Sequence, residues 1–269
     1  MRLIDAHCHL QAAPFEHDAA EVLAAAHNAG IARILVPGYD LASSRAAIAM
    51  AAALGVDASV GIHPHVASGS EADWPAILEL ARDPRVVAVG ETGLDYDRGF
   101  SSGEAQRANL ERHLQLATEL DKPAILHCRS KRGQRDAQDD LVLSVLRNGR
   151  PPAVLHSFSG PLDYAEQALE MGLAISFSGL VFRAGEESSA QVAQLVPDDR
   201  LLVETDSPYL SPPGAPKRRN EPRWVSVTAA WLAQQRGVDP DQLGETLIAN
   251  YDRVFSHARN SSRPSASSR

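Results

Sequence analysis

The feature that most constrains the fold is a regular alternation of short apolar runs with longer helical patterns. Eight runs read as buried β-strands, at residues 3–6, 31–36, 57–61, 86–90, 124–127, 153–156, 173–177 and 201–204. Helical patterns separate them, at residues 19–29, 43–54, 73–81, 104–120, 137–146, 164–171 and 189–195, and two more follow at 225–236 and 241–255. Strands and helices in this order predict right-handed βαβ units and a parallel sheet.

Eight repeats of this unit favour the α/β class and a closed (β/α)8 TIM barrel. An open doubly wound sheet is the alternative, because sequence periodicity does not report closure. The 269 residues suit one barrel, and no linker-like stretch interrupts the pattern, so we expect a single domain over residues 1–256. Residues 257–269 are rich in Ser, Arg and Pro, and we expect them to form a disordered C-terminal tail.

Histidines and carboxylates gather where the predicted strands end. In a barrel the carboxyl ends of all strands meet on one rim, which is where active sites lie. A His-x-His pair at the first strand places both rings on one face of an extended chain. We therefore expect six side chains from five strands to form one cluster: His7, His9, Glu91, His127, His156 and Asp206.

Imidazole and carboxylate groups are ligands of divalent metal ions. Six of them are too many for one tetrahedral ion, but they suit two ions that share a bridging carboxylate. A two-metal site lowers the pKa of a water molecule and stabilises attacking and leaving oxygens, which indicates a hydrolase. A purely structural metal site is the alternative, although such sites are usually closed by protein ligands. The sequence has neither a G-x-S-x-G elbow nor a P-loop.

The remaining histidines and the cysteines have simpler interpretations. Taken alone, His63 and His65 are more typical of core or loop residues than of ligands. Cys8 and Cys128 are expected to pack as small apolar side chains, and their number favours a reducing cytoplasm over a disulfide framework. We interpret four histidines on helices or loops as surface residues: His17, His27, His113 and His257.

The chain is acidic, but two predicted loops on the active rim are basic. A net charge of −8 argues against binding of nucleic acid by an overall basic surface. The basic residues crowd the loops after the fifth and eighth strands: Arg129, Lys131, Arg132 and Arg135, and then Lys217, Arg218, Arg219 and Arg223. A solvated face remains the alternative for Lys131 and Arg132. Basic side chains above a metal site suggest an anionic substrate, and our hypothesis is a phosphodiester polymer.

Seven short strings, in order along the chain, carry a family resemblance. They are DAHCHL (5–10), VGIHPH (60–65), VGETGLDY (89–96), ILHCRS (125–130), LHSFSG (155–160), ETDSPYL (204–210) and RNEP (219–222). Together they resemble the TatD-type metal-dependent deoxyribonucleases of the amidohydrolase superfamily. The resemblance runs over about residues 1–255.

The resemblance implies a TIM barrel with a pair of divalent ions. Glu91 would bridge the ions, and Asp206 would activate water. Mg or Mn would be the metals used in function, while Zn or Ni would also bind to the histidines. The substrate would be single-stranded DNA, cleaved from 3′ to 5′, with tolerance for RNA. One ion would be held by His7, His9, Glu91 and Asp206, and the other by Glu91, His127 and His156. His63 and Arg129 would contact phosphate, a role we extend to Arg218 and Arg219, and Glu204 would support the ligands from behind.

The sequence also departs from the family pattern. The segment 215–222 lacks a glycine that members often carry, Gln106 is followed by Leu110 where a phenylalanine is common, and residues 131–138 do not align. These departures concern substrate preference more than chemistry.

A small-molecule amidohydrolase or lactonase and a tRNA-linked deacylase are the alternative functions. We expect a cytoplasmic monomer without membrane segments, since no apolar run approaches about 18 residues.

Overall fold

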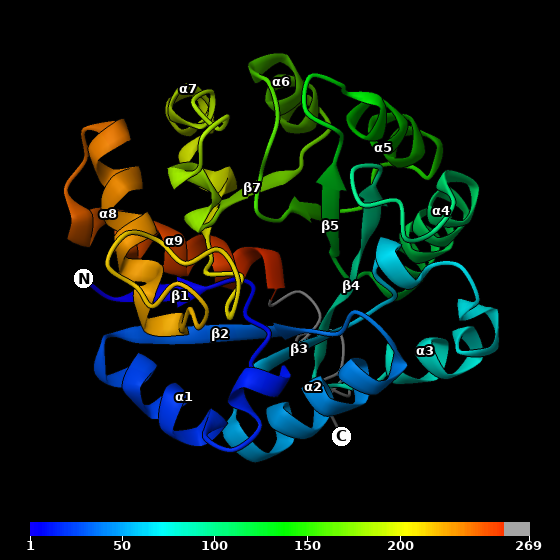
Figure 1. Ribbon diagram of the computed structural model, residues 1–269, viewed down its shortest axis with the longest axis horizontal. Coiled ribbons are helices and arrows are strands. Elements are labelled where there is room, and N and C mark those ends of the chain that lie inside the picture. Colours follow the sequence, from blue (N-terminus) through cyan, green and yellow to red (C-terminus); the bar gives the residue numbers. More distant parts are fainter. Residues whose placement is uncertain (256–269) are drawn as a thin grey trace, which may run out of the picture.

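Eight parallel strands form the centre of the molecule in a computed structural model that describes residues 1–255 (Figure 1). Each strand pairs with its neighbours in sequence order, from the first strand to the eighth. The strands are β1 Leu3–Asp5, β2 Ile31–Pro37, β3 Asp57–Val60, β4 Val86–Asp95, β5 Ala124–Arg129, β6 Ala153–Leu155, β7 Ala174–Phe177 and β8 Leu201–Val203.

Backbone hydrogen bonds join the last strand to the first. The amide of Ala6 donates to the carbonyl of Val203 at 3.0 Å, and the amide of Asp206 donates to the carbonyl of His7 at 2.9 Å. His9 N–H donates to Ser207 O at 2.8 Å, just beyond the strands. These bonds close the sheet, so the predicted (β/α)8 barrel is confirmed and an open sheet is excluded.

Helices surround the strands and cover one end of the barrel (Figure 1). The last helix lies against the amino-terminal end, where the Asn250 amide donates to the carbonyl of Leu201 at 2.8 Å and the Tyr251 hydroxyl lies 2.9 Å from the Asp57 carboxylate. The helices are α1 Ala19–Asn28, α2 Leu41–Leu54, α3 Trp74–Leu80, α4 Gly103–Leu120, α5 Asp136–Arg147, α6 Leu162–Glu170, α7 Ser189–Leu195, α8 Val225–Arg236 and α9 Pro240–Phe255.

Strand β4 is longer than its apolar run predicts. The predicted run ends at Gly90, whereas the strand continues to Asp95 because Gly93 pairs with His127 of β5. Gly93 has φ +137°, and a Cβ there would lie 1.9 Å from the carbonyl oxygen of His127. Only glycine permits this close approach. The extension places Glu91 and Asp95 on the same strand, so both carboxylates lie at the carboxyl end of the barrel.

One predicted surface histidine is buried, so that prediction was wrong. His113 of α4 is fully buried, with Nε2 accepting the amide hydrogen of Ile62 at 3.0 Å. A helical pattern assigns a polar residue to the outer face, but this ring satisfies a backbone amide inside. His17 and His27 are exposed, as predicted.

Other predictions concern the cysteines and the end of the chain. Cys8 is buried and Cys128 is partly buried, and neither forms a disulfide, in agreement with a packing role. No helix within residues 1–255 is long and apolar enough to span a membrane. His257 and the predicted tail 257–269 lie outside the described residues.

Candidate metal centre

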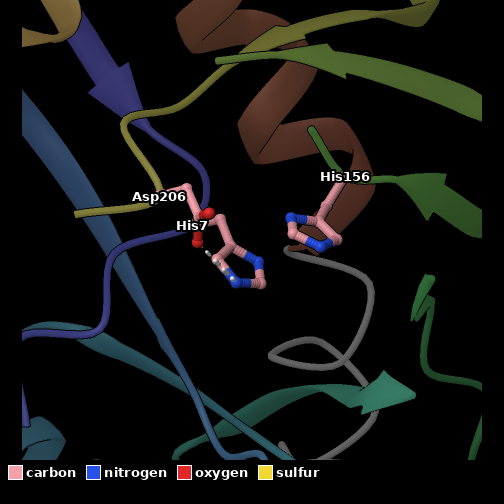
Figure 2. A group of neighbouring side chains, drawn as sticks. All are labelled: His7, His156 and Asp206. Atoms are coloured by element: carbon pink, nitrogen blue, oxygen red, sulfur yellow. Dashed lines mark ion pairs between the residues drawn. The ribbon is translucent and has the colours of Figure 1, made fainter. Parts of the chain in front are cut away.

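All six predicted ligands converge at the carboxyl end of the barrel. Figure 2 shows three of them: the rings of His7 and His156 stack with centroids 4.0 Å apart, and Asp206 lies beside His7. Each comes from a strand or from the segment that directly follows one. They are His7 and His9 after β1, Glu91 in β4, His127 in β5, His156 after β6 and Asp206 after β8.

One group of ligands surrounds the Nε2 atom of His7. This atom lies 3.2 Å from Nε2 of His9 and 3.3 Å from Oε2 of Glu91. Oδ1 of Asp206 lies 3.8 Å from it and 3.4 Å from Nε2 of His9. Four potential ligand atoms thus face one small volume.

A second group surrounds the other oxygen of Glu91. Oε1 lies 2.9 Å from Nε2 of His156 and 3.2 Å from Nδ1 of His127. Those two nitrogens are 3.1 Å apart. Nε2 of His63 also lies 3.2 Å from the same oxygen, which adds a potential ligand to the predicted set. Glu91 therefore directs one oxygen to each group, which is how a bridging carboxylate is arranged.

The spacing of these atoms fits bound divalent cations. Two ligands that each lie about 2.1 Å from one ion are about 3.0 to 3.4 Å apart, depending on the coordination geometry. Nε2 of His7 meets this condition with Nε2 of His9 and with Oε2 of Glu91, and Oε1 of Glu91 meets it with Nδ1 of His127 and with Nε2 of His63. The distance from Nε2 of His9 to Oε2 of Glu91 is longer, at 3.7 Å. Facing imidazole nitrogens need a proton or a cation between them, and a cation satisfies all of them together.

Electrostatics keep the Glu91 carboxylate ionised. Burial opposes the charge on Glu91, but His63, His156 and His7 surround it and hold its pKa well below the usual value. Burial also disfavours a charged His156, yet Glu91 and Glu204 raise its pKa well above the usual range. For His7, burial and the neighbouring His156 lower the pKa. The site therefore concentrates negative charge where imidazole nitrogens converge.

Glu204 contacts one predicted ligand from behind. Its Oε1 lies 3.1 Å from Nδ1 of His156, and the carboxylate is fully buried. A carboxylate that accepts the Nδ1 hydrogen leaves Nε2 free to act as a ligand. Glu204 thus orients His156 so that Nε2 faces Glu91.

A buried network also holds the segment that carries Asp206. The carboxylate of Asp5 accepts hydrogen bonds from the amide and hydroxyl of Thr205, at 2.9 and 2.6 Å. Burial nevertheless raises the pKa of Asp5 to about 8. The side-chain amide of Asn220, from the segment after β8, donates to the carbonyls of Thr205 and Tyr209 at 3.0 and 2.8 Å. Asp206 lies between two backbone positions that this network fixes.

The sequence arguments missed the role of Asp95 and His65. Oδ2 of Asp95 lies 2.7 Å from Nε2 of His65 and 3.4 Å from Nε2 of His127. Burial opposes ionisation of Asp95, but its bonds with both histidines hold its pKa below the usual value. Asp95 thus orients His127 while Glu91 contacts the other ring nitrogen. Asp95 could have been identified from its position four residues after Glu91, but the strand was predicted to end at Gly90, so Asp95 was not placed on it.

The predicted substrate contacts fall into two kinds. His63 lies in the cluster itself. Arg129 and Arg219 are near the rim but are paired with carboxylates: Nε of Arg129 lies 3.0 Å from Asp97, and Nη2 of Arg219 lies 2.5 Å from Asp18. The exposed Arg218 completes the predicted set. The basic rim is thus less strongly charged than the sequence suggests.

Known proteins share this fold over nearly the whole chain. The family model described as TatD related DNase matches residues 4–256. A relative from Cronobacter sakazakii, named 3′-5′ ssDNA/RNA exonuclease TatD, is 38% identical over 94% of this chain and 97% of its own. A relative of the same name from Citrobacter rodentium is 37% identical, with the same coverage.

A solved structure adds agreement in three dimensions. A TatD homologue from Escherichia coli K12 superimposes with a TM-score of 0.86 at 30% identity, over 95% of this chain and 98% of the other. The resemblance in sequence and the shared barrel therefore agree. The chain belongs to the TatD-related DNase family of metal-dependent hydrolases.

Proposed function

We propose that this protein is a divalent-metal-dependent exonuclease that degrades single-stranded DNA or RNA from the 3′ end. The observation that carries the proposal is Glu91, whose two oxygens face two separate groups of ligands. Relatives at 37 and 38% identity bear the name of such an exonuclease, and they align with nearly all of this chain.

The residues present suit two ions, with Mg or Mn as the expected metals. His7, His9, Glu91 and Asp206 would hold one ion, and Glu91, His127 and His156 the other, with His63 within reach of the second group. When bound, such ions acidify water and stabilise the charge that develops on a phosphodiester.

Asp206 is the proposed general base. Burial disfavours its charge, but a hydrogen bond from His9 and the charges of His9 and His7 lower its pKa below the usual value. An ionised carboxylate can orient a water molecule and accept its proton. The backbone amide of Asp206 is fixed on the carbonyl of His7 at 2.9 Å, so the carboxylate is held beside the ligands.

We propose phosphate contacts for His63, Arg129 and Arg218. The exposed Arg218 is free to approach a backbone phosphate, and Arg129 contacts Asp97 through Nε at 3.0 Å, so it would exchange that contact for one with phosphate. Arg219 is held more firmly, because its Nη2 contacts both carboxylate oxygens of Asp18. We therefore assign Arg219 chiefly to holding the segment after β8. We further propose that the protein acts as a monomer in the cytoplasm, in keeping with two cysteines that form no disulfide.

The test uses metal-free protein and 5′-labelled oligonucleotides of single-stranded DNA, double-stranded DNA and RNA. Mg, Mn and Zn are restored separately. We expect a ladder that shortens by single nucleotides on single strands, and a blocked 3′ end should prevent it. If every nucleic acid stays intact with every metal while a lactone or amide is hydrolysed, the nuclease proposal is wrong.

Asp206→Asn tests the general base. The rate should fall by about 100-fold or more while the unfolding temperature stays near that of the parent. Asp241→Asn is the matched control, because Asp241 pairs with the amino terminus in the region of α9, away from the ligands. Full activity of Asp206→Asn would contradict the assignment.

A further inference from the structure

Two aromatic side chains are exposed beside the metal centre. Within residues 1–255, Phe100 and Tyr209 are the only aromatic members of the set of exposed large hydrophobic residues, with 68% and 58% of their surface accessible. Each ring contacts a histidine of the site edge-on, with interplanar angles of 89° for Phe100 and 71° for Tyr209. The ring centroid of Phe100 lies 4.8 Å from that of His65, and the centroid of Tyr209 lies 5.8 Å from that of His9.

The two rings lie on opposite sides of the ligands. Phe100 follows β4 and Tyr209 follows β8, and these strands are half a turn apart in a barrel of eight. The half-buried ring of Tyr39, after β2, lies 5.5 Å from His9 on the same side as Tyr209. A substrate that crosses the cluster therefore meets an aromatic surface on each side.

Hydrogen bonds anchor the backbone of Tyr209 and the residue next to Phe100. The amide of Tyr209 donates to the carbonyl of Asp206 at 2.9 Å, and Asn220 donates to the carbonyl of Tyr209 at 2.8 Å. Next to Phe100, the hydroxyl of Ser101 donates to the carbonyl of His65 at 3.1 Å. Anchored backbone at or beside a ring reduces the conformational entropy that is lost when a flat ligand stacks on it.

We infer that Phe100 and Tyr209 are stacking platforms for the two bases that flank the scissile phosphate. Every base has a flat face that stacks on an aromatic ring without regard to sequence. Bases in a duplex are already stacked on each other, so these platforms favour single strands. This inference rests on the proposed nuclease function and names the residues that hold the bases of the substrate.

The experiment measures binding of a labelled single-stranded DNA by fluorescence anisotropy, in the Asp206→Asn background, in which cleavage should be about 100-fold slower or more. Phe100→Ala and Tyr209→Ala should each raise Kd by about 5- to 150-fold, the range for loss of one stacked base. Tyr209→Phe keeps the ring and should bind as the parent does. Leu143→Ala, which truncates an exposed apolar residue of α5, is the matched control and should also leave Kd unchanged.

A second series of DNAs, each lacking one base, identifies the stacked positions. Removal of the base that stacks on Tyr209 should weaken binding to the parent but not to Tyr209→Ala, and the same should hold for another base and Phe100→Ala. The two positions should lie on either side of the phosphate that is cleaved. Each ring would then be matched to one base.

Several outcomes would overturn the inference. Alanine variants that bind as the parent does would exclude stacking, and so would an equal loss of affinity on removal of any base. If the exposed rings instead serve to dock another protein, neither variant will change Kd for DNA. Failure of the wild-type protein to cleave any nucleic acid would count against the proposed function itself, and that assay is separate from these binding measurements.

Discussion

A buried histidine of α4 should make the stability of the barrel depend on pH. Nε2 of His113 accepts the amide hydrogen of Ile62 at 3.0 Å, and Nδ1 lies 2.7 Å from the carbonyl of Asn109. Both bonds together require a neutral ring that carries its proton on Nδ1. Burial lowers the pKa of His113 from 6.5 to about 3. Protonation would cost the bond to Ile62, the residue that precedes His63.

The sign of the effect follows from which state binds the proton. Between pH 6.5 and about 3 the unfolded chain protonates His113 and the folded chain does not. The stabilisation is therefore complete above pH 6.5 and is lost as the pH falls toward 3. At pH about 5 the protonated form of His113 in the unfolded chain exceeds the neutral form by about 30 to 1. The free energy of unfolding should therefore fall by about 2 kcal/mol between pH about 7.5 and 5.

The substitution His113→Gln separates titration from packing. Its side-chain oxygen can accept the Ile62 amide hydrogen but does not titrate. The free energy of unfolding is measured in urea at both pH values, with a chelator present so that metal release does not contribute. At the higher pH the variant should be about 1 kcal/mol less stable, for the lost bond to Asn109.

The decisive quantity is the difference between the two pH values. Wild type should lose about 2 kcal/mol more than His113→Gln on acidification, because the other titrating groups are common to both proteins and cancel. Equal losses in the two proteins would refute the argument.

Two further predictions concern the ligands and the rim. Gly93→Ala should displace His127, since the new Cβ would lie 1.9 Å from the carbonyl oxygen of His127. Metal affinity, measured by calorimetry, should therefore fall by about 10-fold or more. An unchanged affinity would show that β5 adapts. Arg218→Glu should weaken binding of single-stranded DNA and reduce the slope of log affinity against log salt by about 0.7 for a lost phosphate contact, whereas Arg219→Glu should mainly lower the unfolding temperature by repulsion from Asp18. The reverse order of these two effects would contradict our assignment of the two arginines.

The architecture could be predicted because it depends on local patterns. Most strand residues are buried on both faces, so the strands read as largely apolar runs, and helices such as α6 and α9 have a clear amphipathic period. The position of a residue at the end of a strand then gives its place on the rim. For this reason the sequence alone predicts that His7, His127 and His156 lie at one site.

Other features depend on atoms that meet only in the folded chain. Each oxygen of Glu91 faces a different group of ligands, because β4 continues past its apolar run and pairs with β5. His113 is buried because the backbone amide of Ile62, far away in sequence, needs an acceptor.

The charge of the rim shows most clearly what the sequence predicts and what only the folded chain decides. Composition places basic residues in the loops around the site, but it does not say how much of their charge is free. Arg129 is paired with Asp97, and Arg219 is paired with Asp18, which lies 201 positions away in the chain. The sequence by itself determined the repeated βα pattern and placed the candidate ligands at strand ends, because both follow from local apolar patterns, whereas closure of the barrel was decided by the hydrogen bonds between its first and last strands. The tertiary structure alone decided which charges remain free to meet a substrate, because ion pairing depends on distances between segments that no local pattern specifies.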